Sequence, residues 1–131
     1  MNSQRWAWAQ IDLGALRHNV ATLVAHLAPQ QLWAVVKADA YGHGAVECAR
    51  VALQSGAHGL CVALVQEGIV LRQAGINAPI LIMSEQPEEQ FRDIIQYGLI
   101  ATLYNESTIV RFARTASELE IMASVHVKVD S

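Results

Sequence analysis

Short apolar runs alternate with amphipathic stretches along the whole chain, and this alternation limits the choice of fold more than any other feature. After a first strand and helix, we expect five strands with four helices between them. The interior of the second strand is apolar on both faces, which is typical of a parallel sheet covered by helices on both sides. The apolar runs that predict strands are residues 6–11, 32–37, 59–63, 80–83, 99–102 and 121–129. The pattern therefore predicts an α/β fold in which parallel strands alternate with helices.

The ends of the helices carry their own signals. Asp12 can accept hydrogen bonds from the free amides of the first helix, and Asn105 can do the same for the last helix. Pro87 lies near the first turn of another helix, where its missing N–H costs little. The first helix is expected to end before Pro29. Its packing face is expected to consist of Leu13, Leu16, Val20, Leu23 and Leu27.

Two architectures fit this order of elements. One is a complete, small, doubly wound sheet of the flavodoxin-like kind. The other is about the first half of a (β/α)8 TIM-type barrel, which takes about 250 residues, whereas this chain has 131. No helix follows the last predicted strand. We therefore expect residues 1–131 to be part of a larger domain, and we expect their unpaired strand edges to promote self-association.

Composition excludes several classes of function. Nine basic and twelve acidic residues give a net charge of −3 without any basic cluster, which argues against nucleic-acid binding. The longest apolar runs are too short to span a bilayer, and the N-terminus lacks the pattern of a signal peptide. We expect a cytoplasmic protein that does not bind membranes, with Cys48 and Cys61 as reduced, buried thiols.

Lys37 is the candidate for chemistry, because it ends an apolar strand in the stretch "AVVKADAYGHG" of residues 34–44. In both architectures the carboxyl ends of the strands line the active site. An amine among apolar side chains favours its neutral form, which is a nucleophile toward aldehydes such as pyridoxal phosphate. Tyr41 offers a donor for the phosphate, while Gly42 and Gly44 permit a tight turn. A lysine in this position is nevertheless more often an ordinary solvated residue.

Three segments together resemble the alanine racemases. The stretch around Lys37 is similar to the pyridoxal-phosphate attachment motif of that family. "IDLGALRHNV" resembles the segment that opens these enzymes, and "VHVKVDS" resembles the start of a later motif. The family pattern includes Arg17, His18 and Asn19, which we interpret as residues for helix packing and surface contacts. The resemblance covers essentially this whole chain but only about the first third of a usual family member.

The resemblance implies a barrel fold, pyridoxal 5'-phosphate as cofactor and a role for three residues. Lys37 matches the lysine that forms the internal aldimine and acts as the base on the D-alanine face. Tyr41 matches a tyrosine that hydrogen-bonds the cofactor phosphate. Lys128 matches a lysine that is carbamylated in some members and then helps to orient an arginine on the substrate side. Near a strand end, however, Lys128 is just as well an ordinary charged residue.

The family reaction needs a second acid/base group on the other face of the substrate. The resemblance places it on a tyrosine of the partner subunit's C-terminal domain, and none of Tyr41, Tyr97 and Tyr104 matches that context. We therefore expect an N-terminal fragment of a homodimeric racemase that is inactive alone. The family substrate is alanine, made into its D-form for peptidoglycan or consumed in catabolism, although serine or another small amino acid also fits.

Two other interpretations compete with a racemase. A non-catalytic vitamin-B6 carrier of the same barrel type would keep the lysine, although the "ADAYGHG" loop is more similar to the racemase version. A flavodoxin-like signalling or binding domain would carry no cofactor. It would need an acidic cluster at the first strand ends to hold Mg²⁺, and the sequence has none there.

Overall fold

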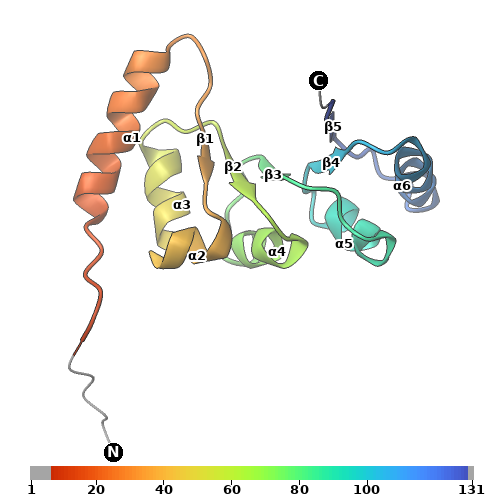
Figure 1. The fold of residues 1–131 in the computed structure, drawn as a ribbon, viewed down its shortest axis with the longest axis horizontal. Coiled ribbons are helices and arrows are strands. Elements are labelled where there is room, and N and C mark those ends of the chain that lie inside the picture. The colour runs from red at the N-terminus through yellow and green to blue at the C-terminus, as the bar shows by residue number, and fades with distance from the viewer. Residues whose placement is uncertain (1–6, 130–131) are drawn as a thin grey trace, which may run out of the picture.

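The structure is a computed structural model that describes residues 7–129. Five short strands and six α-helices alternate along them (Figure 1). The strands are β1 (Trp33–Val35), β2 (Gly59–Val62), β3 (Ile80–Ile82), β4 (Ala101–Leu103) and β5 (Val125–Val127). The helices are α1 (Leu13–Leu27), α2 (Lys37–Gly42), α3 (Ala45–Gln54), α4 (Val65–Gln73), α5 (Phe91–Gln96) and α6 (Glu106–Glu118), with a short 3-10 turn, η1 (Glu88–Gln90), before α5. The predicted α/β fold is confirmed.

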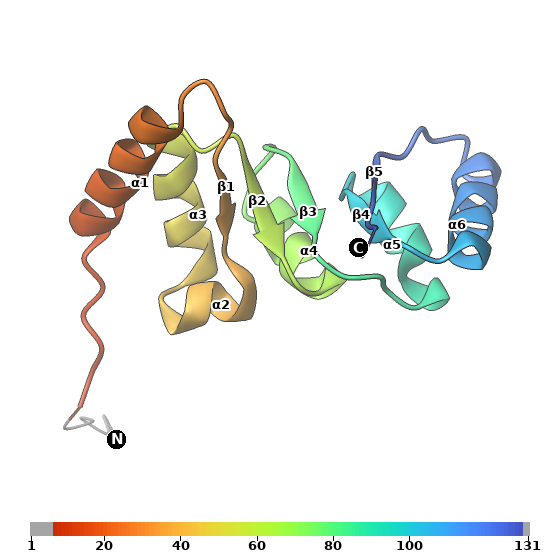
Figure 2. The ribbon, with the colours of Figure 1, turned by 45° about the horizontal axis from the view of Figure 1, so that its top comes forward.

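All strand pairs are parallel and follow the order of the chain. β1, β2 and β3 form one ladder, and β4 pairs with β5. A bridge between Leu81 and Ile100 joins the two ladders, because the N–H of Ile82 donates to the Ile100 carbonyl at 2.9 Å. Figure 2 shows the strands side by side in this order, from α1 at one end to α6 at the other. The carboxyl ends of all five strands therefore lie on one edge of the sheet.

The sheet curves strongly enough for its first and fifth strands to meet through their side chains. The rings of Trp33 in β1 and His126 in β5 lie 6.3 Å apart between centroids. Trp33 pairs in register with Gly59, and a Cβ on that glycine would come within 2.7 Å of the indole ring. The glycine thus makes room for the indole on the concave face, where side chains fill the interior of a barrel.

The core lies against the middle strands. Leu60, Ile80 and Ile82 are fully buried there, and Phe91 packs edge-on against Phe112 beneath them. All three residues of β5, by contrast, are exposed. Buried side chains therefore stabilise the middle of the sheet, whereas β5 is joined to it mainly by its backbone hydrogen bonds with β4.

The sequence predicted that side chains cap the first and last helices. The Asp12 side chain accepts from the Ala15 N–H at 2.9 Å, and Asn105 accepts from the Ser107 N–H at 3.0 Å, so both predicted caps are confirmed.

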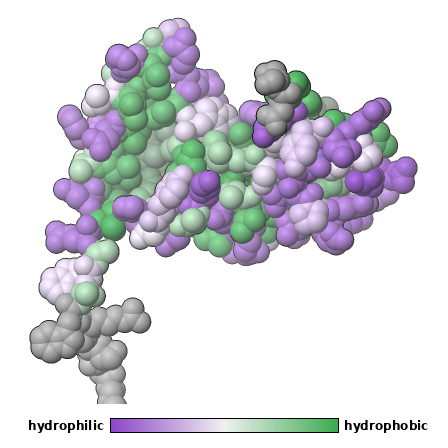
Figure 3. Space-filling model, viewed as in Figure 1, coloured by the Kyte–Doolittle hydropathy of each residue, from purple (hydrophilic) through white to green (hydrophobic). Residues whose placement is uncertain are grey.

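The predicted packing face of α1 is covered only in part. Val20 is buried, but Leu23 is 49% exposed, because no described segment covers that side of the helix. Figure 3 shows the resulting hydrophobic band along α1.

Two predicted strands are corrected. In residues 6–11, position 6 lies outside the described residues, and residues 7–11 form no strand because no neighbouring strand pairs with them. The strand predicted over 121–129 covers only Val125–Val127, since its partner β4 has three residues and the Ile121 N–H closes the end of α6 instead. The strand expected to reach Lys37 ends at Val35, because the chain then leaves the ladder for a left-handed turn over residues 38–41.

Candidate functional site around Lys37

Lys37 lies two residues after the end of β1, at the carboxyl edge of the sheet where the sequence predicted it. The Val36 N–H still donates to the Cys61 carbonyl at 2.9 Å, and the chain then leaves the ladder. Lys37 itself is half-buried. This is the position that active-site residues take in parallel barrels.

The chain after Lys37 forms a left-handed turn. Ala38, Asp39, Ala40 and Tyr41 have φ values between +50° and +56°. An L-residue in this conformation costs roughly 1–2 kcal/mol, so the turn stores energy that its contacts must offset. The two predicted glycines, at positions 42 and 44, also have positive φ, but the turn begins on four residues that have side chains.

Glu67, on the first turn of α4, holds the start of this turn. Its Oε1 accepts from the Ala38 N–H at 2.6 Å, while its Oε2 accepts from the N–H groups of Ala63 at 2.8 Å and Leu64 at 3.0 Å. Burial alone would raise the pKa of Glu67, but these backbone donors and the positive charge of Lys37 outweigh it and lower that pKa. The carboxylate is therefore charged at neutral pH.

Asp39 and His43 hold the far end of the turn. Asp39 Oδ1 accepts from the Ala45 N–H at 2.7 Å and so satisfies a free amide at the start of α3. The His43 Nδ1 donates to the Ala40 carbonyl at 2.8 Å, and the Gly44 N–H donates to the Asp39 carbonyl at 2.9 Å. The imidazole thus supports the turn while remaining exposed, in keeping with an exposed turn residue.

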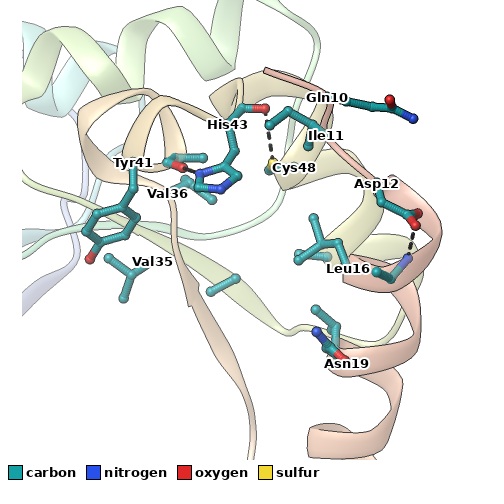
Figure 4. Close-up of a pocket in the computed structure, with 15 residues that line it drawn as sticks. Gln10, Ile11, Asp12, Leu16, Asn19, Val35, Val36, Tyr41, His43 and Cys48 are labelled. Atoms are coloured by element: carbon teal, nitrogen blue, oxygen red, sulfur yellow. Dashed lines mark hydrogen bonds between the residues drawn. The ribbon is translucent and has the colours of Figure 1, made fainter. Parts of the chain in front are cut away.

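Tyr41 presents its ring at the surface beside the end of β1. It is 60% exposed, and Figure 4 shows the ring next to Val35. Both residues line a groove of about 490 Å³ between the N-terminal segment, α1 and the first strand. The phenol is therefore free to donate to a molecule bound near this edge.

Cys48 lines the same groove, and Cys61 lies on β2. Both thiols are free and buried, as expected. Burial raises the pKa of Cys61, and burial together with the charges of Asp39 and Glu47 raises the pKa of Cys48. Thiols of this kind are poor nucleophiles at neutral pH.

Lys128 lies at the same edge of the sheet but at the far end in strand order. It follows β5, its side chain is exposed, and its N–H donates to the Leu103 carbonyl at 2.9 Å. It lines a second groove, of about 610 Å³, together with Met83, Ser84 and Tyr104.

The run of Arg17, His18 and Asn19 lies on α1. All three side chains are exposed, and Asn19 reaches the groove beside β1. The interpretation as surface residues is confirmed, and the interpretation as helix packing is not.

Glu85, after β3, makes a second carboxylate contact that the sequence did not reveal. Its Oε2 accepts from the N–H groups of Tyr104 at 3.0 Å and Asn105 at 3.2 Å, and its Oε1 accepts from the Thr108 hydroxyl at 3.1 Å. Burial would raise the pKa of Glu85, but these hydrogen bonds and the charge of Arg111 lower it overall.

Glu67 was missed as well. A helix N-terminus is usually recognised from Ser, Thr, Asp or Asn three residues before a Glu, and that position is Leu64 here. Its contact with Ala38 spans 29 positions, which no local pattern reveals.

Comparison with known proteins decides the family. The family described as "Alanine racemase, N-terminal domain" matches residues 11–131. The chain belongs to this family. It is 50% identical to an alanine racemase of Nostoc sp. (strain PCC 7120), with 98% of this chain and 34% of that protein covered. The flavodoxin-like alternative is thereby excluded.

Solved structures agree on the fold. An alanine racemase of Clostridium difficile 630 in complex with cycloserine superimposes with a TM-score of 0.87 at 40% identity, over 94% of this chain and 33% of that one. An alanine racemase of Bacillus anthracis with bound L-Ala-P gives a TM-score of 0.87 at 30% identity, over 96% and 33%. The predicted partial barrel is confirmed, and the chain spans about a third of the length of its relatives.

Residues 7–129 offer neither a metal site nor a membrane span. No group of three or more His, Cys, Asp or Glu side chains there could hold a metal ion. None of the helices in that range is long and apolar enough to cross a membrane.

Proposed function

We propose that this chain is the Lys37-bearing part of a pyridoxal-phosphate-dependent racemase that interconverts L- and D-alanine. The observation that carries the proposal is the position of Lys37, at the carboxyl end of a parallel strand and next to a turn that presents Tyr41. Family membership and the names of the relatives support the same activity. Residues 1–131 would be the N-terminal part of the barrel domain.

The residues around Lys37 fit the proposed cofactor. The Lys37 amine would bind the aldehyde group, and the exposed Tyr41 phenol would donate to the phosphate. Pyridoxal phosphate supplies an electron sink that stabilises negative charge at the substrate α-carbon. One short segment of the chain would thus supply both an amine for the aldehyde and a hydrogen-bond donor for the phosphate.

The proton transfers would fall to side chains. Lys37 would move the α-proton on the D-alanine face, and a second acid/base group must act on the opposite face. Tyr97 follows α5 and precedes β4, so it lies toward the opposite edge of the sheet from Lys37. We propose that the second group comes from the C-terminal domain of a partner subunit in a cytoplasmic homodimer, and that the 131-residue chain alone does not racemise alanine.

Lys128 has a separate proposed role. Its amine would react with CO₂ to form a carbamate and release a proton, which would place a negative charge beside the second groove. A carbamate signal in the ¹³C NMR spectrum after incubation with ¹³CO₂, absent from Lys128→Arg, would support this role. The physiological purpose, D-alanine for peptidoglycan or alanine catabolism, follows from the same proposal.

The test uses a fusion protein in which this chain is followed by the unmatched two thirds of the Clostridium difficile relative. The fusion protein is incubated with pyridoxal phosphate and reduced with borohydride, and the adduct is mapped by mass spectrometry. We expect the label on Lys37 and none there in Lys37→Ala. A folded fusion protein without a label on Lys37 would exclude both a racemase and a vitamin-B6 carrier. A labelled protein that does not racemise alanine would favour the carrier.

A further inference from the structure

We propose that Glu67 is a positioning residue for Lys37, because its carboxylate holds the Ala38 N–H and thereby fixes where the Lys37 side chain leaves the sheet. The inference rests on the proposed function of Lys37. Glu67 belongs to α4 and contacts Ala38 across 29 positions of sequence, at 2.6 Å. Ala38 is the residue directly after Lys37, so this bond fixes the peptide plane between them.

The turn needs such a support. Four successive residues with side chains adopt the left-handed conformation directly after Lys37. Strained backbone persists only where surrounding contacts over-determine it. Asp39 anchors the far end of the turn on Ala45, and Glu67 anchors the near end. Without the near anchor, the turn can relax and carry the Lys37 Cα with it.

A purely structural role for Glu67 explains only part of its contacts. A glutamate at the third position of a helix commonly reaches back to the amides that precede the helix, and the bonds to Ala63 and Leu64 are of this kind. The bond to Ala38 is the shortest of the three and plays no part in capping α4. It joins the segment after β1, where Lys37 lies, to the first turn of α4.

Substitution by glutamine removes the Ala38 bond selectively. Both carboxylate oxygens of Glu67 face N–H donors only. A glutamine has one acceptor oxygen, so its NH₂ group must face one set of donors. The oxygen retains two bonds if it faces Ala63 and Leu64, which leaves Ala38 without an acceptor.

Glu85→Gln is the matched control. Its oxygen can still accept from Tyr104 and Asn105, and its NH₂ group can donate to the Thr108 hydroxyl, which also accepts. This variant removes a carboxylate of the same kind, on the same edge of the sheet, without leaving a backbone N–H unpaired.

The first measurement is amide hydrogen exchange of the 131-residue chain, without cofactor. We expect Glu67→Gln to speed the exchange of the Ala38 amide by about tenfold or more, with Ala63 and Leu64 changing much less. Glu85→Gln should leave Ala38 unchanged. Equal Ala38 exchange in Glu67→Gln and in the unsubstituted chain would overturn the inference, and so would an equal increase in Glu85→Gln.

The second measurement is the rate of borohydride-trapped labelling of Lys37 in the fusion protein. We expect about a tenfold slower rate in Glu67→Gln than in Glu85→Gln at the same fraction folded. Glu67→Asp keeps the charge but is one methylene too short, and it should also be slow. A normal rate in either Glu67 variant would overturn the positioning role. Absence of labelling in the unsubstituted fusion protein would instead reject the proposed function, while the Ala38 exchange would still test the anchor.

Discussion

Glu67, on the helix after β2, and Glu85, after β3, perform similar tasks at the carboxyl edge of the sheet, yet their partners differ. Each lies at the carboxyl edge and accepts hydrogen bonds from an adjacent strand end. Glu67 faces three N–H groups, whereas Glu85 faces two N–H groups and the hydroxyl of Thr108. A hydroxyl can reverse its hydrogen bond and an amide cannot, so only the Glu67 contact strictly requires a carboxylate.

The backbone that each carboxylate contacts also differs, because it is strained beside Glu67 and regular beside Glu85. Glu67 holds a left-handed turn, whereas Glu85 holds the two backbone N–H groups just before the regular helix α6, which Asn105 caps. The strained conformation and the stricter anchor thus coincide at the end of the sheet that carries Lys37. Strain of this kind clusters at sites where a side chain must be held in one direction.

The largest expected difference between the two ends concerns association. Val127 on β5 is 63% exposed, whereas Val35 on β1 is 38% exposed and lines the groove beside α1. We expect the chain to self-associate through its open strands, and Val127→Lys to reduce the association more than Val35→Lys. Sedimentation velocity over a range of concentrations measures this. A stable monomer of the unsubstituted chain at all concentrations would contradict the prediction.

The strained turn gives the next largest contrast. Ala38→Gly should raise the free energy of unfolding by about 1 kcal/mol, because glycine adopts positive φ without penalty. The control, Ala113→Gly on the exposed face of α6, should lower it by about 1 kcal/mol. Urea unfolding measures both. If Ala38→Gly and Ala113→Gly destabilised the protein by a similar amount, the turn after Lys37 would not be strained, and the prediction would be wrong.

The sequence predicted most of the fold but little of this turn. Five strands follow from apolar runs, and Asp12 and Asn105 mark helix starts through purely local chemistry. The conformation of Ala38 and Ala40 runs against the strong right-handed preference of alanine, so no propensity could indicate it. Their anchor, Glu67, comes from another part of the chain.

Lys37 itself was recognised because its neighbours in sequence form the motif. The failed strand at residues 6–11 shows the opposite case. Its composition suits a strand, but a strand exists only where a partner offers its ladder, and Trp8 remains 81% exposed.

The carboxylates provide a third, smaller contrast. Glu67→Gln should lower the free energy of unfolding by about 1–2 kcal/mol more than Glu85→Gln, since only the former leaves an N–H donor unpaired. Thermal and urea unfolding of both variants measure the difference. Equal losses would show that the Thr108 hydroxyl does not compensate at Glu85.

The smallest expected effect is on pH dependence. Both carboxyls have a folded pKa below the ordinary value of 4.5, so their contribution to stability is complete above that pH and is lost as the pH falls through the lower folded value. Urea unfolding from pH 7 down to about pH 3 should show this loss, and it should be weaker in either glutamine variant. If the free energy of unfolding fell with pH as steeply in both glutamine variants as in the unsubstituted chain, the prediction would be wrong.

The most direct test of the role of Lys37 is racemisation of alanine in D₂O by the fusion protein. We predict that L-alanine yields D-alanine labelled with deuterium at the α-carbon, and that Lys37→Ala slows this by about 10²–10⁴-fold, while Glu85→Gln leaves it unchanged. The relative's own enzyme serves as the positive control. A Lys37→Ala fusion protein that racemises as fast as the unsubstituted one would contradict the account.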